Sequence, residues 1–202
     1  MQKTNNPLTI IFIGPQGSGK GTQIELLDHK LRELEPARKI IDIQTGRRFR
    51  ALSAKQEGYT ENEVHKTLNT GVLQPLFLSV VLWGDAFHHH ADATCHILMD
   101  GFPRTVHEAQ VLESALVFYK REHLIIINLE TPEEVVRERM IARARPDDTH
   151  ESIEARLKWY REETLPVLSY YRERNNTTII DCDGTQSIEV VHACIMETLG
   201  VR

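Results

Sequence analysis

The sequence predicts an α/β fold in which helices cover both faces of a doubly wound, parallel sheet of five strands. Two observations lead to this prediction. Helical patterns separate the apolar runs, and strands that alternate with helices form a parallel sheet through right-handed crossovers. The runs themselves are short, and most are β-branched or flanked by polar residues, as buried strands are. They are residues 8–13, 39–43, 96–99, 124–129 and 177–181.

A glycine-rich loop, GPQGSGKGT at residues 14–22, follows the first run and leads into a helical pattern. Glycines let backbone N–H groups surround an anion, and the start of the next helix adds partial positive charge. Lys20 can reach the β and γ phosphates of a nucleotide, and Thr22 offers a hydroxyl to Mg²⁺. The general motif has Ser or Thr directly after the lysine, whereas Gly21 intervenes here. The loop therefore predicts a P-loop NTPase-type fold.

A helix over residues 76–87 is predicted to end at three consecutive histidines, residues 88–90. A metal site that also uses Asp92 and His96 is conceivable there. However, adjacent histidines on a helix point in different directions. We therefore interpret the three as a solvated helix end.

Three helices are predicted in the second half of the chain. One begins at Thr131 and Pro132, with the hydroxyl as the cap and the proline at the first helical position. A second covers residues 149–173, where Pro166 should kink or split it. The third covers residues 185–199 and ends before a glycine.

Composition limits the possible partners. The net charge of −5 argues against binding nucleic acid through bulk charge. No apolar run approaches the ~18 residues of a membrane-spanning helix, and residues 1–7 are polar, without a secretion segment. Cys95, Cys182 and Cys194 are widely spaced and include no Cys-x-x-Cys pair. We expect reduced thiols, no zinc site and a cytoplasmic protein.

A second motif, DGFPR at residues 100–104, follows the third run. Asp100 stands at the end of a predicted strand, where a P-loop protein places a carboxylate that holds Mg²⁺ directly or through water. Gly101 and Pro103 shape a turn that directs Arg104 into the cleft. Such a string beside a Gly-Lys-Gly-Thr loop is far more specific than an isolated Asp-Gly turn.

These two motifs resemble those of the nucleoside monophosphate kinases, and among them the adenylate kinases most closely. The resemblance covers nearly the whole chain, including Thr45-Gly46 before Arg50, residues 71–75, and the arginine-rich segment 139–156. It implies reversible phosphoryl transfer from Mg-ATP to AMP by a monomer. It also implies one domain, residues 1–202, with a core (1–43, 74–142 and 150–202), a monophosphate-binding insert (44–73) and a short lid (143–149).

The resemblance assigns roles to the residues that stand at the family's site positions. Those near ATP are Gly17, Ser18, Gly19, Lys20, Gly21, Thr22 and Arg139. Those near the monophosphate are Thr45, Gly46, Arg50, Leu73, Gly101, Arg104 and Glu108. Those that stabilise the transferred group are Lys20, Arg104, Arg143, Arg145 and Arg156. From their charge and their place beside these arginines, we expect Asp147 and Asp148 to anchor the guanidiniums. Thr22 and Asp100 would position Mg²⁺.

Two departures from the family pattern bear on specificity. Arg47 and Arg48 stand where the family usually has an acid, and either add positive charge near the acceptor or face solvent. Glu108 stands where the family has a glutamine that reads adenine. An ionised carboxylate only accepts hydrogen bonds, so it could accept from the amino group of adenine or of cytosine. Alternatively, Glu108 is a surface residue and the backbone reads the base.

AMP is the favoured acceptor, and a pyrimidine monophosphate kinase acting on CMP or UMP is the alternative. A nucleotide-binding protein with decayed turnover is a second alternative, against which the intact lysine, Asp100 and arginines argue. A GTPase-type switch is disfavoured because no Asn-Lys-x-Asp string is present.

Overall fold

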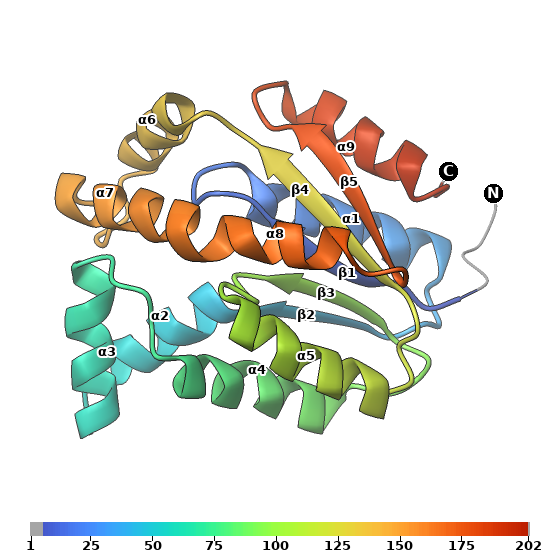
Figure 1. The fold of residues 1–202 in the computed structure, drawn as a ribbon, viewed down its shortest axis with the longest axis horizontal. Coiled ribbons are helices and arrows are strands. Elements are labelled where there is room, and N and C mark those ends of the chain that lie inside the picture. The colour runs from blue at the N-terminus through green and yellow to red at the C-terminus, as the bar shows by residue number, and fades with distance from the viewer. Residues whose placement is uncertain (1–5, 202) are drawn as a thin grey trace.

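A computed structural model of the protein describes residues 6–201, so most of the polar N-terminal segment, residues 1–5, lies outside the described residues. Five strands form one sheet in the order β2-β3-β1-β4-β5, and all four pairings are parallel. The predicted doubly wound, five-stranded parallel sheet is thereby confirmed (Figure 1). The strands are β1 Thr9–Ile13, β2 Ile40–Gln44, β3 His96–Asp100, β4 Leu124–Glu130 and β5 Thr177–Asp183.

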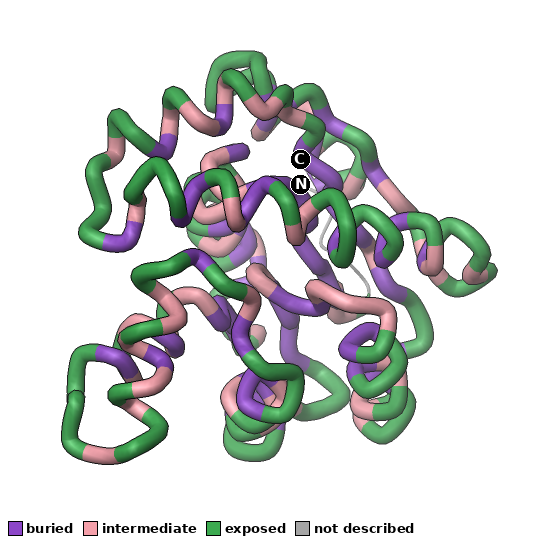
Figure 2. The backbone as a smooth tube through the Cα atoms, turned by 60° about the vertical axis from the view of Figure 1, so that its left-hand side comes forward, coloured by how far each residue is buried: buried purple, intermediate pink, exposed green. Residues whose placement is uncertain are grey.

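Helices pack on both faces of the sheet. On one face lie α1 (Lys20–Leu34) and α9 (Ile188–Thr198), and on the other α4 (Leu76–His90), α5 (Val106–Phe118) and α8 (Leu165–Arg172). Side chains of β1 alternate between the two cores, since Ile10 and Phe12 belong to one and Ile11 and Ile13 to the other. Figure 2 shows the strands as the buried centre of the molecule.

Two smaller clusters lie beyond the carboxyl end of the sheet. Helices α2 (Thr45–Lys55) and α3 (Tyr59–Asn69) pack against α4 through Phe49, Val64 and Leu78. Helices α6 (Glu133–Arg143) and α7 (His150–Trp159) pack through Val136, Met140, Ile153 and Leu157. Figure 1 shows α2 and α3 on one side of this end and α6 and α7 on the other. The proposed insert and lid belong to these two groups, and their boundaries stay a prediction.

The helix predicted over residues 149–173 is interrupted. It comprises α7, a π-helical turn η1 (Tyr160–Thr164) and α8, with Pro166 in the first turn of α8. Proline has no N–H to continue the α-helical pattern, which explains a break at this point. The interruption predicted at Pro166 is confirmed, and its π-helical form is an addition.

Two predicted helix starts are wrong in detail. The last helix begins at Ile188, because the Ser187 hydroxyl accepts the cap hydrogen bond from the N–H of Val190. Thr185 instead donates to Asp183 in a turn before the helix. The N-cap position of helix α6 is Pro132, with no side-chain cap, and the hydroxyl of Thr131 has no partner among the described residues.

The remaining sequence features have plain locations. The three histidines of residues 88–90 are exposed in the last turn of α4, as predicted, and the His89 ring lies 3.1 Å from Asp85. All three cysteines are free thiols, although Cys182 and Cys194 bring their Sγ atoms within 2.9 Å of each other. Within residues 6–201, no helix has the length and apolar character to cross a membrane.

Candidate active site

A cavity of about 740 Å³ opens at the carboxyl ends of the strands, where parallel sheets bind ligands. Its walls come from the loop between β1 and α1, the start of α2, the loop after β3, the end of α6 and the start of α9. Most of the predicted site residues line it: Gly17, Ser18, Gly19, Lys20, Gly21, Thr22, Gly46, Arg50, Asp100, Gly101, Arg104, Arg139, Arg143 and Arg145. A smaller cavity of about 30 Å³ adjoins it and shares Gln16, Gly46, Arg50, Arg104 and Trp159 with it.

The loop between β1 and α1 is curled tightly. Gly17 has φ +92°, and a Cβ there would come within 2.8 Å of the carbonyl oxygen of Val136, so only glycine fits. The Lys20 ammonium donates to the carbonyl oxygens of Gly14 (2.7 Å) and Pro15 (2.8 Å). Burial lowers the pKa of Lys20 to about 8, and Arg104 and Arg143 add to this effect while Asp100 opposes it. A phosphate bound here would favour the charged lysine.

Asp100 and Thr22 face the same cavity. The buried Oδ1 of Asp100 has no hydrogen-bond partner among the described residues, so a carboxylate oxygen is available to a ligand. No group of three or more His, Cys, Asp or Glu side chains in residues 6–201 could hold a metal ion. One acid and one hydroxyl suit Mg²⁺, which keeps several waters and binds substrate phosphates. Asp100 and Thr22 would hold a hydrated Mg²⁺ ion beside the substrate phosphates.

Arg50 and Arg104 border both cavities. Arg50 lies four residues after Gly46 on α2, and its Nη1 would be 3.6 Å from a Cβ at that glycine. Burial lowers the pKa of both arginines, and for Arg104 the charges of Glu108 and Asp100 oppose that effect. Arginine remains protonated despite such shifts. Two cations therefore face one partly enclosed space, which suits a phosphate dianion.

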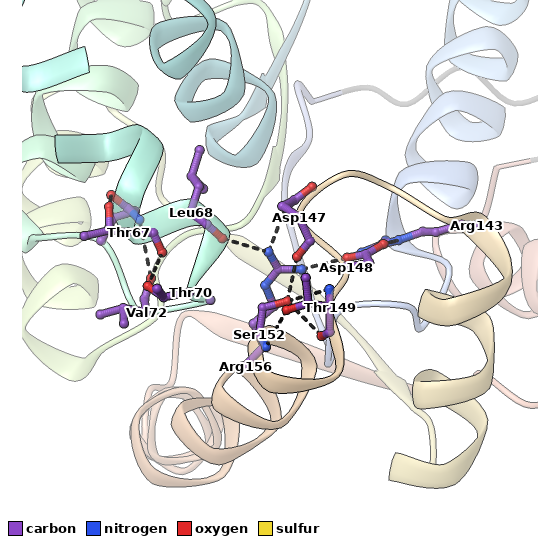
Figure 3. A network of polar contacts seen from close by, with 12 residues as sticks. Thr67, Leu68, Thr70, Val72, Arg143, Asp147, Asp148, Thr149, Ser152 and Arg156 are labelled. Atoms are coloured by element: carbon purple, nitrogen blue, oxygen red, sulfur yellow. Dashed lines mark hydrogen bonds and ion pairs between the residues drawn. The ribbon is translucent and has the colours of Figure 1, made fainter. Parts of the chain in front are cut away.

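Arg143 and Arg156 share a carboxylate (Figure 3). Asp148 accepts from Arg143 at Nε (2.6 Å) and Nη2 (3.0 Å), and from Nη1 of Arg156 (2.7 Å). Asp147 accepts from Nη2 of Arg156 at 2.7 Å. Burial acts to raise the pKa of Asp148, but the two arginines outweigh it and hold the pKa below its usual value. The expected anchoring of arginines by these two acids is thus present.

Arg145 and Arg139 complete the wall. Ala144 adopts a left-handed conformation (φ +47°) that ends α6 and turns the chain, and Arg145 follows it. No hydrogen bond or ion pair to the side chain of Arg145 occurs within the described part of the chain. Arg139 donates from Nη1 to the carbonyl oxygen of Gly184 at 2.8 Å, beside the start of α9.

Four predicted residues lie outside the larger cavity. Arg156 instead borders the smaller one. Leu73 is half-buried and lines neither cavity. Thr45 is buried at the start of α2, where its hydroxyl faces Gly101 and donates to the carbonyl oxygen of Asp100 at 3.5 Å. Thr45 therefore supports the turn that presents Asp100.

Glu108 is buried, with 3% of its surface exposed. Its Oε1 accepts from the hydroxyl of Ser79 (2.5 Å) and the indole N–H of Trp83 (3.2 Å), and its Oε2 accepts from the backbone N–H of Arg104 (2.7 Å). The alternative that Glu108 is a surface residue is wrong. The carboxylate joins α4 to the Arg104 segment, and it lines neither cavity.

Glu108→Gln should destabilise the protein, although glutamine has nearly the same shape. Three donors converge on the carboxylate, so the amide nitrogen of glutamine must face at least one of them and leave it unsatisfied. We expect a loss of about 1–3 kcal/mol in the free energy of unfolding, measured by urea denaturation. Glu122→Gln, at an exposed position, is the control and should change stability little. Equal stability of the two variants would contradict this account of Glu108.

The structure adds cavity residues that the sequence motifs did not reveal. Trp159 at the end of α7 and Tyr160 and Thr164 of the π-helical turn line the larger cavity, and Gln16 borders both cavities. Arg47 lines the larger cavity and pairs with Glu25 of α1, with 55% of its side chain exposed. A position of Arg47 near the acceptor was one of the two alternatives that its charge suggested. The π-helical turn has no sequence signal beyond Pro166.

The fold and the site define the chain as a nucleoside monophosphate kinase, a phosphotransferase. A family model described as "Adenylate kinase" matches residues 12–176. Adenylate kinase of Corynebacterium diphtheriae is 36% identical over 96% of this chain and 99% of its own. Adenylate kinase 1 of Synechocystis sp. is 36% identical over 90% of this chain and 91% of its own, and adenylate kinase of Nocardia farcinica is 33% identical over 96% and 99%. The chain belongs to the adenylate kinase family, and the pyrimidine alternative is not favoured.

Proposed function

We propose that this protein catalyses the reversible reaction ATP + AMP ⇌ 2 ADP with Mg²⁺. One observation carries the proposal: a single cavity contains both the phosphate loop with Lys20 and the pair Arg50 and Arg104. Two phosphate-bearing ligands could therefore meet end to end within it. The charge that spreads over a moving phosphoryl group needs positioning and positive charge more than a covalent intermediate.

The residues divide by their place in the cavity. Lys20 and the loop amides hold the donor phosphates, and Arg139 lies beside the donor base. Arg50 and Arg104 hold the acceptor phosphate. Arg143 and Arg145, with Arg156 from the adjoining smaller cavity, stabilise the transferred group. Thr22 and Asp100 position Mg²⁺ through water. The metal supplies charge neutralisation on the phosphates when bound.

The insert (residues 44–73) and the short lid (143–149) would close over the bound nucleotides and exclude water, which competes with the acceptor. The residues in these roles line two adjoining cavities of one chain, so the site needs no residue from a second subunit, and we propose a monomer. The free cysteines support a reducing, cytoplasmic location.

A panel of acceptors tests the proposal. Purified protein with Mg-ATP is given AMP, CMP, UMP, GMP or dTMP, and nucleoside diphosphate formation is measured. We expect AMP to have the highest kcat/KM. If CMP or UMP exceeds AMP about tenfold, the acceptor assignment fails, and tight ATP binding without product from any acceptor would refute turnover altogether.

A further inference from the structure

A π-helical turn brings two side chains of the helix α7–α8 onto Arg104. In η1 the N–H of Leu165 donates to the carbonyl oxygen of Tyr160, five residues earlier. Residues five apart on an α-helix point about 140° away from each other, whereas the wider π turn brings them towards one side. Trp159 and Thr164 are five apart, and both contact Arg104. Single π turns inside helices frequently occur at functional sites.

Arg104 is held at four points. Its Cζ lies 4.7 Å from the centre of the Trp159 ring, with the guanidinium over the ring face. Its Nε donates to the carbonyl oxygen of Gly101 (2.6 Å), its backbone N–H donates to Glu108, and its carbonyl oxygen accepts from Thr164 (3.1 Å). Among residues 6–201, nothing hydrogen bonds to Nη1 or Nη2. The two nitrogens that can grip a phosphate are thus left available on a fixed group.

Trp159 also reaches the segment that follows α3. Its indole N–H donates to the carbonyl oxygen of Gly71 at 3.0 Å. Gly71 has φ +72°, and a Cβ there would come within 2.7 Å of the Cα of Ser152, so this turn packs directly on α7. One turn earlier, Arg156 donates to the carbonyl oxygen of Leu68 at 3.3 Å (Figure 3). Trp159 therefore contacts Arg104 and the Gly71 turn at the same time, while that turn lies against α7.

Trp159 is not explained as a core residue. It belongs to none of the hydrophobic clusters within the described residues, it is only partly buried, and it borders both cavities. A ring face against a cation, with the indole N–H on a backbone carbonyl, is an arrangement that both orients and links groups.

We propose that Trp159 is a positioning residue for acceptor binding: it orients Arg104 for the acceptor phosphate and ties that orientation to closure of the segment 68–71 on α7. Thr164 assists by holding the backbone of Arg104. This inference rests on the proposed role of Arg104 as a ligand of the acceptor. In this proposal the π-helical turn places the side chains of Trp159 and Thr164 against Arg104.

Two substitutions separate the contacts of Trp159. Trp159→Leu removes the ring face and the N–H, and Trp159→Phe keeps a ring face and removes the N–H. For Trp159→Leu we expect the KM for AMP to rise about tenfold and kcat to fall severalfold, with the KM for ATP changed less than about twofold. Trp159→Phe should recover most of kcat. Lys158→Ala, at the exposed neighbouring position, is the matched control and should resemble the unaltered protein.

A double-mutant cycle tests whether Trp159 acts through Arg104. In an Arg104→Lys background, where no planar guanidinium remains to stack, Trp159→Leu should raise the KM for AMP less than about twofold. Equal effects in the two backgrounds would overturn the inference. So would an equal rise in KM for ATP and AMP, because a general structural defect predicts that result.

A third measurement needs no substrate. The fluorescence emission of Trp159 is obtained by subtracting the spectrum of the Trp159→Phe variant, which retains Trp83, from that of the protein. The emission maximum of Trp159 should shift when Arg104 is replaced in Arg104→Lys. An unchanged emission would contradict the contact. Absence of turnover by the unaltered protein with every acceptor would instead refute the proposed function, so the two failures are distinguishable.

Discussion

Lys20→Met should reduce kcat about 10²- to 10³-fold while the protein remains folded. The ammonium donates to two loop carbonyls and, at 3.5 Å, to the Ser18 hydroxyl, and it lies in the cavity with Arg104 and Arg143. Removal of one preorganised donor to developing charge costs about 2.7–4 kcal/mol of transition-state stabilisation. Methionine has a similar length and no charge, so it keeps the packing of the loop. Steady-state assay of ADP formation under saturating ATP and AMP measures the loss.

The pH dependence of ATP binding serves as the control for Lys20. Burial depresses its pKa to about 8 without a ligand, so above that pH the free protein must take up a proton to bind phosphate in the charged form. ATP affinity should therefore fall from about pH 8 upward. Lys20→Met lacks this group, and its weaker binding should be flat over the same range. Normal turnover by Lys20→Met, or an unchanged pH slope, would contradict the role proposed for the lysine.

Local sequence patterns were sufficient to predict the strands and most of the lysine and arginine side chains that line the larger cavity. The loop at residues 14–22 and the string at 100–104 each follow a strand, so parallel topology alone brings Lys20, Asp100 and Arg104 to one end of the sheet. Each of these three residues belongs to a short motif of adjacent residues. Residue type and spacing were therefore enough to predict where they lie. Most of the candidate site was open to prediction for that reason.

The contacts of Glu108 and Trp159 were not open to prediction in this way. Glu108 meets Ser79 and Trp83 of α4, which are 29 and 25 residues away in the chain. Trp159 reaches Gly71 across 88 residues. Such pairs depend on how helices pack together, and a single sequence has no local pattern that reports it. For Glu108 the single signal in the sequence was a charged residue where the family has a glutamine. That signal did not distinguish a buried side chain from an exposed one.

The charge balance of the site explains why two acids accompany its arginines. Arg156 is 4% exposed, and an isolated cation at such a site would be costly. Asp147 and Asp148 compensate Arg156 from two sides, and Asp148 also fixes Arg143. Arg50 and Arg145 have no such partner within residues 6–201, and the pKa of each is lowered by burial first. A bound phosphate would neutralise the charges of Arg50 and Arg145. The cavity wall therefore carries uncompensated positive charge before an anion binds.

Asp148→Asn should lower the free energy of unfolding by about 3–5 kcal/mol, the range measured when one partner of a buried ion pair is removed. The side chain of Asp148 has no exposed surface and accepts three hydrogen bonds from Arg143 and Arg156. Asparagine keeps the shape but loses the charge, and its amide nitrogen faces guanidinium donors. Turnover should also fall at least about tenfold, because both arginines lose the group that orients them. Urea denaturation and steady-state assay measure the two effects.

Glu154→Gln is the matched control for Asp148→Asn. Glu154 also accepts two hydrogen bonds from one arginine, Arg137, at 2.7 and 3.3 Å, but it is 59% exposed. Water screens a surface pair of this kind, so this variant should keep both stability and turnover. If the two substitutions cost the same, burial is not what makes Asp148 important.

The effect of Asp148→Asn should also depend on pH in a set direction. The pKa of Asp148 in the folded protein lies below the unfolded value of 3.8. Its contribution to stability is therefore complete above that value and is lost as the pH falls through the lower, folded pKa. The difference in unfolding free energy between the protein and the variant should be constant near neutral pH and shrink below about pH 4. A difference that grows in acid would mean that Asp148 is protonated in the native state and does not anchor the arginines as a carboxylate.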